Sequence, residues 1–228
     1  MIDLQPIYLS LKVALISLVF VFALGIILAW IMARKQFPGK SALEAAVTLP
    51  MVLPPVVTGF VLLLLIGKNG PVGRLLTEYF HTQLIFTPAA AVLAAIVIAF
   101  PLMYQSAKAA FQTIDTHLED AARTLGAGEP RIFFTVTLPL ALPGLVAGAV
   151  LSFARALGEF GATIMIAGNI PGKTQTIPLA IYFAAESNDL REAGIYVAII
   201  SFITFGVIYW LNIWTKAGTK PLPGRSGE

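Results

Sequence analysis

Residues 118–145 read LEDAARTLGAGEPRIFFTVTLPLALPGL, and the first part of this stretch has the pattern of a polar helix within an otherwise apolar chain. One side of that helix carries apolar positions at helical spacing, namely Leu118, Ala121, Ala122 and Leu125. The other side carries Glu119, Asp120 and Arg123. Gly126 can take the left-handed conformation that ends many helices, and Pro130 suits the first turn of a new one. The stretch predicts two helices joined by a glycine turn.

The composition around this stretch is that of a membrane protein. Hydrophobic residues make up 57% of the 228 residues and charged residues 12%, and the mean hydropathy is +0.84. Average soluble chains carry roughly 25% charged residues. The chain has no cysteine, which excludes disulfides, cysteine zinc sites and thiol catalysis but indicates no compartment. We therefore predict an all-α, polytopic helical membrane protein.

Five apolar segments are long enough to span a bilayer. They cover about residues 7–33, 46–66, 85–107, 140–167 and 194–214. Each can cross roughly 30 Å of hydrocarbon, and each must be helical because polar backbone groups cannot be left open to lipid. A sixth run, residues 176–185, is too short to cross and is predicted as a re-entrant or surface helix. The whole chain, residues 1–228, is then a single transmembrane domain.

Lysine and arginine residues in the connections predict the orientation. The segments after the first, third and fifth spans hold nine of them: Arg34, Lys35, Lys40, Lys108, Arg123, Arg131, Lys216, Lys220 and Arg225. The segments after the second and fourth spans hold four: Lys68, Arg74, Lys173 and Arg191. Because positive residues concentrate in cytoplasmic loops, the N-terminus is predicted outside and the C-terminus in the cytoplasm. Residues 108–139 then form a cytoplasmic loop.

A spaced pattern in this loop resembles that of permease subunits of binding-protein-dependent ABC importers. The family pattern is Glu-Ala-Ala, three residues, Gly, nine residues, Ile, one residue and Leu-Pro. The spacing is met by Asp120, Ala121, Ala122, Gly126, Val136, Leu138 and Pro139, with Asp120 in place of Glu and Val136 in place of Ile. The resemblance implies a surface that docks a separate ATPase, made of Glu119, Asp120, Ala121, Ala122, Leu125, Gly126, Arg131, Leu138 and Pro139. Periodicity alone is equally consistent with a connector helix at the membrane interface.

Two longer stretches, residues 34–73 and 123–182, look like the molybdate or tungstate importer branch of this family. Sulfate permeases share the run at residues 155–161, whereas residues 169–182 look closer to the molybdate branch. The resemblance implies the type I permease fold and a homodimer in a bacterial or archaeal inner membrane. It also implies a cytoplasmic ATPase dimer, which uses ATP and Mg²⁺, and an extracytoplasmic oxyanion-binding protein. No cofactor is expected on this chain itself.

Two alternatives to molybdate or tungstate import remain open at this point. The first is the same machine carrying sulfate or thiosulfate, since all these oxyanions are tetrahedral dianions. The second, from another class, is a self-contained secondary anion carrier or channel. Such carriers often show an inverted repeat and polar residues at the membrane midplane, and the sequence shows neither. A lone carrier also has no use for a docking helix.

Charged and proline residues inside the apolar segments indicate a translocation path. Arg155 and Glu159 are four residues apart on the predicted fourth span, where they share a helix face and can pair. Pro54 and Pro55 interrupt the second span just before Thr58, because proline removes a backbone N–H donor. We predict that these five residues line the path. The alternatives are a structural ion pair and a kink that serves packing only.

Several other site classes are not supported by the sequence. Residues 167–174, AGNIPGKT, fit a permissive phosphate-loop pattern but follow a membrane segment instead of a strand, so no nucleotide site is predicted. His81 and His117 are expected on opposite sides of the membrane and form no shared metal site. No catalytic constellation is present, and the basic residues are explained by topology. We therefore predict neither an enzyme nor a nucleic-acid-binding protein.

Overall fold

The computed structural model describes the backbone of residues 3–218 and the side chains of residues 3–214. This described chain is all-α and has no strand, as predicted. Its bilayer-length helices are α1 (Gln5–Arg34), α5 (Pro88–Gln112), the continuous run from α7 to α8 (Glu129–Leu157) and α11 (Leu190–Gly218). Lys220 and Arg225, which contributed to the predicted orientation, lie outside the described residues, as does the side chain of Lys216.

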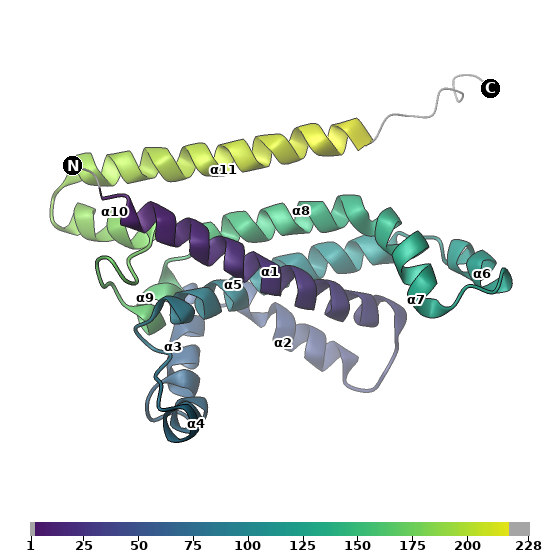
Figure 1. The fold of residues 1–228 in the computed structure, drawn as a ribbon, viewed down its shortest axis with the longest axis horizontal. Coiled ribbons are helices and arrows are strands. Elements are labelled where there is room, and N and C mark those ends of the chain that lie inside the picture. The colour runs from purple at the N-terminus through teal and green to yellow at the C-terminus, as the bar shows by residue number, and fades with distance from the viewer. Residues whose placement is uncertain (1–2, 219–228) are drawn as a thin grey trace.

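Shorter helices connect these long ones. They are α2 (Lys40–Val52), α3 (Pro55–Ile66), α4 (Pro71–Phe80), α6 (Thr116–Thr124), α7 (Glu129–Ile132), the π-helix η1 (Phe133–Thr137), α8 (Leu138–Leu157), α9 (Gly161–Ala167) and α10 (Ile177–Glu186). Figure 1 shows α1, α5, α8 and α11 running along the long axis of the molecule. The helices α6 and α7 lie at one end of this bundle and α9 and α10 at the other, while α3 and α4 project away from it.

The centre of the bundle is the parallel pair α1 and α5. The hydroxyl of Ser17 donates to the carbonyl of Val92 at 3.1 Å, and further along both helices Gly25 lies against Met103. A Cβ on Gly25 would be 2.7 Å from Met103 Cγ, so the absence of a side chain allows this close approach. Both helices therefore cross the membrane in the same direction.

The third core helix, α8, runs antiparallel to α5. Its Gly144 lies against Ala110, near the end of α5, and its Gly148 lies against Ser106, one turn earlier. A Cβ on Gly144 would be 2.5 Å from the Cβ of Ala110. Because lipid tails are as apolar as leucine, close packing of small residues supplies much of the attraction between such helices. Gly144 and Gly148 of α8 allow this close packing against α5.

A return crossing is needed between α1 and α5 because these two helices are parallel. The chain makes it through α2 and α3, which are bent by 117° at a short break. Pro54 and Pro55 lie at the break, and because neither residue has an N–H donor the helical ladder cannot pass through. The sequence predicted one span over residues 46–66, interrupted at these prolines. The interruption is confirmed and is a full break, and the helix before it starts earlier than predicted, at Lys40.

The predicted fourth span, residues 140–167, is also interrupted. The helix α8 ends at Leu157, and a separate helix α9 begins at Gly161. Between them, a Glu159 carboxylate oxygen accepts the N–H of Ala162 at 2.8 Å. This side-chain cap satisfies a backbone donor of a new helix and so favours starting α9 over continuing α8. At its other end the helical run is longer than predicted and begins at Glu129.

The helices α10 and α11 pack on the beginning of α1. The N–H of Ile177 donates to Ser10 Oγ at 2.7 Å, and the hydroxyl of Tyr196 donates to the carbonyl of Asp3 at 2.8 Å. Residues 176–185, predicted as a short helix that does not cross, correspond to α10, which is 10 residues long. The start of α11 therefore lies at the same end of the bundle as the start of α1.

Candidate docking surface and translocation path

The helix α6 is fixed at both ends by local hydrogen bonds. At its start the carboxylate of Asp115 accepts the N–H of His117 at 2.9 Å, which caps the helix. At its end Gly126 is left-handed, with φ of 83°, and its N–H bonds to Arg123 O while the N–H of Ala127 bonds to Ala122 O. These two bonds form a Schellman motif. The glycine turn predicted from the sequence therefore forms.

The outer surface of α6 is unusually apolar for a loop. Leu118 is 49% exposed and Leu125 is 88% exposed, and Ala121 between them is also exposed. Exposed leucines lose the stabilisation of burial, which is about 1.5–3 kcal/mol for a leucine side chain. Small residues between two leucines leave room for another surface to approach closely. This apolar row, Leu118, Ala121, Ala122 and Leu125, is what the structure offers to a partner.

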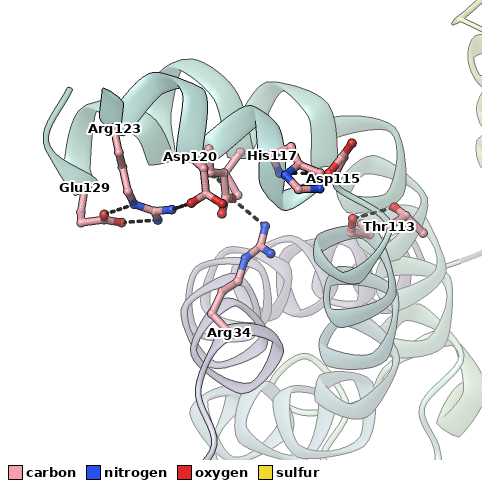
Figure 2. A network of polar contacts seen from close by, with 10 residues as sticks. Arg34, Thr113, Asp115, His117, Asp120, Arg123 and Glu129 are labelled. Atoms are coloured by element: carbon pink, nitrogen blue, oxygen red, sulfur yellow. Dashed lines mark hydrogen bonds and ion pairs between the residues drawn. The ribbon is translucent and has the colours of Figure 1, made fainter. Parts of the chain in front are cut away.

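One residue predicted on the docking surface points the other way. Glu119 is only 5% exposed, and its Oε1 accepts hydrogen bonds from Arg34 Nη2 at 2.6 Å and from Thr137 Oγ1 at 2.7 Å. The assignment of Glu119 to the partner-facing surface was wrong because the helical period places it toward the bundle, where a cation and a hydroxyl satisfy its charge. Figure 2 shows Arg34 reaching from the end of α1 toward α6.

Arg123 holds the glycine turn closed. Its Nε and Nη2 donate to the two carboxylate oxygens of Glu129 at 2.6 and 3.0 Å, and its Nη1 donates to Asp120 at 2.7 Å (Figure 2). Glu129 first, and then Asp120, raise the pKa of the Arg123 guanidinium above its ordinary value through these hydrogen bonds. Asp120 is therefore exposed but already paired. The sequence placed Arg123 on the polar side of α6 and did not predict that it bridges α6 to α7.

The remaining predicted docking residues lie between the loop and the membrane. Arg131 is exposed on α7, Leu138 is half-buried, and Pro139 is exposed in the first turn of α8. The π-helix η1, which the sequence did not predict, separates α7 from α8. Phe133 on it packs edge-on against Trp30 of α1, with ring centroids 5.4 Å apart. The loop is thus joined firmly to the end of α1.

The predicted path residues converge on one junction, where the starts of α3 and α9 meet. A Cβ on Gly161 would be 3.0 Å from the Cβ of Pro55, and a Cβ on Gly59 would be 2.7 Å from the Cα of Ala162. The two breaks in the predicted second and fourth spans therefore lie side by side. Thr58, in the first turn of α3, is 6% exposed, and within the described chain its hydroxyl has no hydrogen-bond partner.

The predicted pair of Arg155 and Glu159 forms at the same junction. Arg155 Nη1 lies 2.8 Å from Glu159 Oε2, and the side chains are 33% and 1% exposed respectively. Because the other Glu159 oxygen caps α9, the carboxylate links the end of α8 to the start of α9. This is a structural role, as one of the two interpretations proposed. The Arg155 side chain nevertheless remains one-third exposed.

The phosphate-loop-like run, residues 167–174, is a self-contained turn. The hydroxyl of Thr174 accepts the N–H of Ile170 and donates to the carbonyl of Gly168, at 3.0 and 3.2 Å. The run follows α9, and no strand precedes it in the part of the chain that the structure describes. Among residues 3–214, no group of three or more histidine, aspartate or glutamate side chains could hold a metal ion.

Comparison with known proteins assigns the family. Residues 14–215 match the family model of the binding-protein-dependent transport system inner membrane component. The chain belongs to this family. The match covers α5 and α8 completely, most of α1 and α11, the loop that carries α6 and the junction of α3 with α9. This inner membrane component, like the permease proteins that it resembles, is therefore a transport subunit and not an enzyme.

Individual relatives cover nearly the whole inner membrane component. The chain is 44% identical to the molybdenum transport system permease protein ModB of Escherichia coli K12, over 97% of this chain and 96% of that protein. It is 46% identical to a putative molybdenum transport permease, YvgM of Bacillus subtilis, over 91% of both chains. A probable sulfate transport permease of Prototheca wickerhamii is 37% identical, over 89% of this chain and 79% of that protein.

A solved structure shows the same fold for this inner membrane component. The match is to a chain in the crystal structure of a bacterial alginate ABC transporter in complex with a periplasmic protein bound to an alginate pentasaccharide. The TM-score is 0.75 at 19% identity, covering 95% of this chain and 79% of that one. The fold is thus that of an ABC importer permease, as predicted.

Proposed function

We propose that this chain is the permease subunit of an ABC importer that passes molybdate or tungstate into the cytoplasm. The observation that carries the proposal is 44–46% identity to molybdenum transport permeases over at least 91% of the chain. The matched length includes the docking loop and the junction of α3 with α9. The proposed substrate class therefore follows these molybdenum transport relatives.

The apolar row of α6 supports a cytoplasmic ATPase as partner. The row exposes Leu125 almost fully, while Glu119 and Arg123 hold the helix in place from its other sides. A rigid helix that presents leucines and alanines can enter a groove on another protein. One copy of α6 would engage one ATPase subunit. ATP and Mg²⁺ are used there, and this chain binds neither.

The break between α2 and α3 supports a homodimer. Beside this break, Val52 is 81% exposed and Met51 is 53% exposed. The side chains of Val56 and Val57 are also nearly half exposed. Irregular backbone at membrane depth is tolerated only where protein or a water-filled cavity covers it. A second copy of the chain, related by a two-fold axis, would cover the break and enclose the path between the two copies. Arg155 would then face an anion-tolerant vestibule.

The remaining assignments concern the binding protein, the membrane and the conformational change. An extracytoplasmic oxyanion-binding protein delivers the anion to the end of the bundle where α10 lies, and the inner membrane of a bacterium or archaeon holds the permease. Because that binding protein provides the affinity, the path needs no cluster of basic residues, which would retain a dianion. ATP-driven closure of the ATPase dimer moves α6 and so switches the spans between inward- and outward-facing states.

A second candidate cargo is sulfate or thiosulfate. The 37% identity to a probable sulfate permease and the shared residues 155–161 favour it over any non-oxyanion cargo. The lower identity and the smaller share of that relative covered, 79%, rank it below molybdate.

ATP hydrolysis in proteoliposomes tests the proposed function. The permease and its cognate ATPase are reconstituted together, and the cognate binding protein is added with molybdate, tungstate or sulfate in turn. Stimulation of hydrolysis by molybdate or tungstate alone is expected. Stimulation by sulfate would support the assignment as an ABC importer permease but would replace molybdate by sulfate as the transported anion. Failure to assemble with any ATPase would overturn the docking role of α6 and reopen a self-contained carrier.

A further inference from the structure

The docking helix α6 has one buried carboxylate that bonds to the transmembrane bundle, in addition to the exposed Arg123–Glu129 pair that links it to α7. Glu119 is the buried residue of α6, whereas the leucines of this helix are exposed. Burying a charge is costly unless it is paired and hydrogen-bonded. The pairing here is made with residues outside α6, because Arg34 is the last residue of α1 and Thr137 is the last residue of η1.

The two partners of Glu119 belong to two different membrane helices. Arg34 is 85 residues away in the sequence and lies at the end of α1, and Thr137, which is 1% exposed, directly precedes α8. A single Glu119 oxygen, Oε1, accepts hydrogen bonds from both residues. One atom of α6 is therefore bonded both to the end of α1 and to the residue just before α8. The chain connects α6 to α5 through the short peptide link 113–115, in which Ile114 is buried in the core.

We propose that Glu119 is a positioning residue for transport, which makes α6 move together with α1 and the start of α8. This inference rests on the proposed function, in which an ATPase moves α6. A push on α6 reaches α1 through Arg34 and reaches α8 through Thr137. The peptide link 113–115 acts as the hinge toward α5. Loss of the tether leaves only the Arg123–Glu129 pair and the chain links to hold α6, so that less of its movement reaches α1 and α8.

The test measures coupling separately from assembly. In proteoliposomes the anion transported per ATP hydrolysed is compared for wild type, Glu119→Ala and the control Glu78→Ala, which removes an exposed acid on α4. Glu119→Ala is expected to keep ATPase assembly, because the apolar row is untouched. It should lower the transport-to-hydrolysis ratio about five- to tenfold, the lower range for coupling between two sites. A ratio equal to that of Glu78→Ala would overturn the proposal.

A double variant separates positioning from simple stability. Replacing a buried ion pair by apolar residues of similar size often restores stability. Arg34→Leu with Glu119→Leu is therefore expected to unfold near the wild-type temperature but to keep the low transport-to-hydrolysis ratio. Recovery of both stability and the ratio would show that the pair is merely structural. Glu119→Gln keeps the shape and the acceptor oxygen, so its transport-to-hydrolysis ratio should lie between those of wild type and Glu119→Ala. It takes the place of Glu119→Ala in the transport assay if that variant fails to fold.

A distance measurement tests whether Glu119 holds α6 to α1, even when no ATPase is bound. Because the chain has no cysteine, labels can be placed at Lys35, just after α1, and at Thr124, at the end of α6, in one copy of a mixed dimer. A narrow distribution of spin-label distances is expected in wild type and a broad one in Glu119→Ala, which removes the acceptor oxygen. Equal widths would overturn the tether. If wild type assembles with no ATPase, the proposed function fails, and the label widths still report on the tether alone.

Discussion

The closest helix contact at the junction of the two breaks makes Gly59→Ala a sharp test of the fold. A Cβ at this position would lie 2.7 Å from the Cα of Ala162, whereas ordinary contacts start at 3.4 Å. The obstructing atom belongs to the backbone, so α3 must move away from α9 by about 0.7 Å or more. Overpacking of this kind costs about 1–3 kcal/mol, and the better helix propensity of alanine returns about 1 kcal/mol.

The net expectation for Gly59→Ala is a loss of about 0–2 kcal/mol relative to wild type. Relative to a Gly→Ala change with no steric conflict, the loss is about 1–3 kcal/mol, or a Tm lower by about 2–12 °C for a chain of this size. Gly206→Ala is the matched control, because on α11 no atom lies within 4 Å of the added Cβ. Thermal unfolding of both variants in the same detergent measures the difference. A Gly59→Ala protein as stable as Gly206→Ala would refute the close packing of α3 on α9.

Three further predictions concern the loop and the ion pair. Gly126→Ala should lower the free energy of unfolding by about 1 kcal/mol, because Gly126 has a left-handed φ of 83°. Gly128→Ala should leave it nearly unchanged, because Gly128 has an ordinary φ of −74°. Comparison of the two unfolding free energies tests the turn. Leu125→Asp should leave folding unchanged, since the side chain is 88% exposed, but weaken ATPase binding by about tenfold or more in a pull-down titration. The matched change Leu190→Asp, on a 69% exposed leucine at the other end, should not weaken it. Arg155→Ala should destabilise the permease by about 2–4 kcal/mol, because it strands a buried carboxylate; unchanged transport in that variant would exclude the vestibule role.

The sequence was sufficient for features governed by local chemistry. The left-handed turn at Gly126 and the helix start around Pro130 follow from the backbone preferences of single residues, and both form as expected. Apolar length likewise predicted the long helices, because lipid leaves the backbone no alternative to helix. The prolines at 54 and 55 predicted an interruption. They did not predict its angle, which depends on how α3 packs against α9.

The orientation of Glu119 shows where sequence patterns are insufficient. Periodicity separated it correctly from the leucines of α6, but a charged side of a helix normally faces water. Only the fold brings Arg34 and Thr137 to it and makes burial of this carboxylate favourable. The end of α8 at Leu157 is a similar case, because nothing local required Glu159 to cap a new helix at Ala162.

The sequence by itself thus determined that the chain crosses a membrane as helices, where its polar loop begins and ends, and which family pattern that loop carries. These properties depend on hydrophobic length and on the conformational limits of single glycines and prolines. The tertiary structure decided that the two broken spans meet at their breaks and that α6 is tied to α1 and α8 through one carboxylate. Such contacts join residues tens of positions apart, and only packing of the whole bundle selects them.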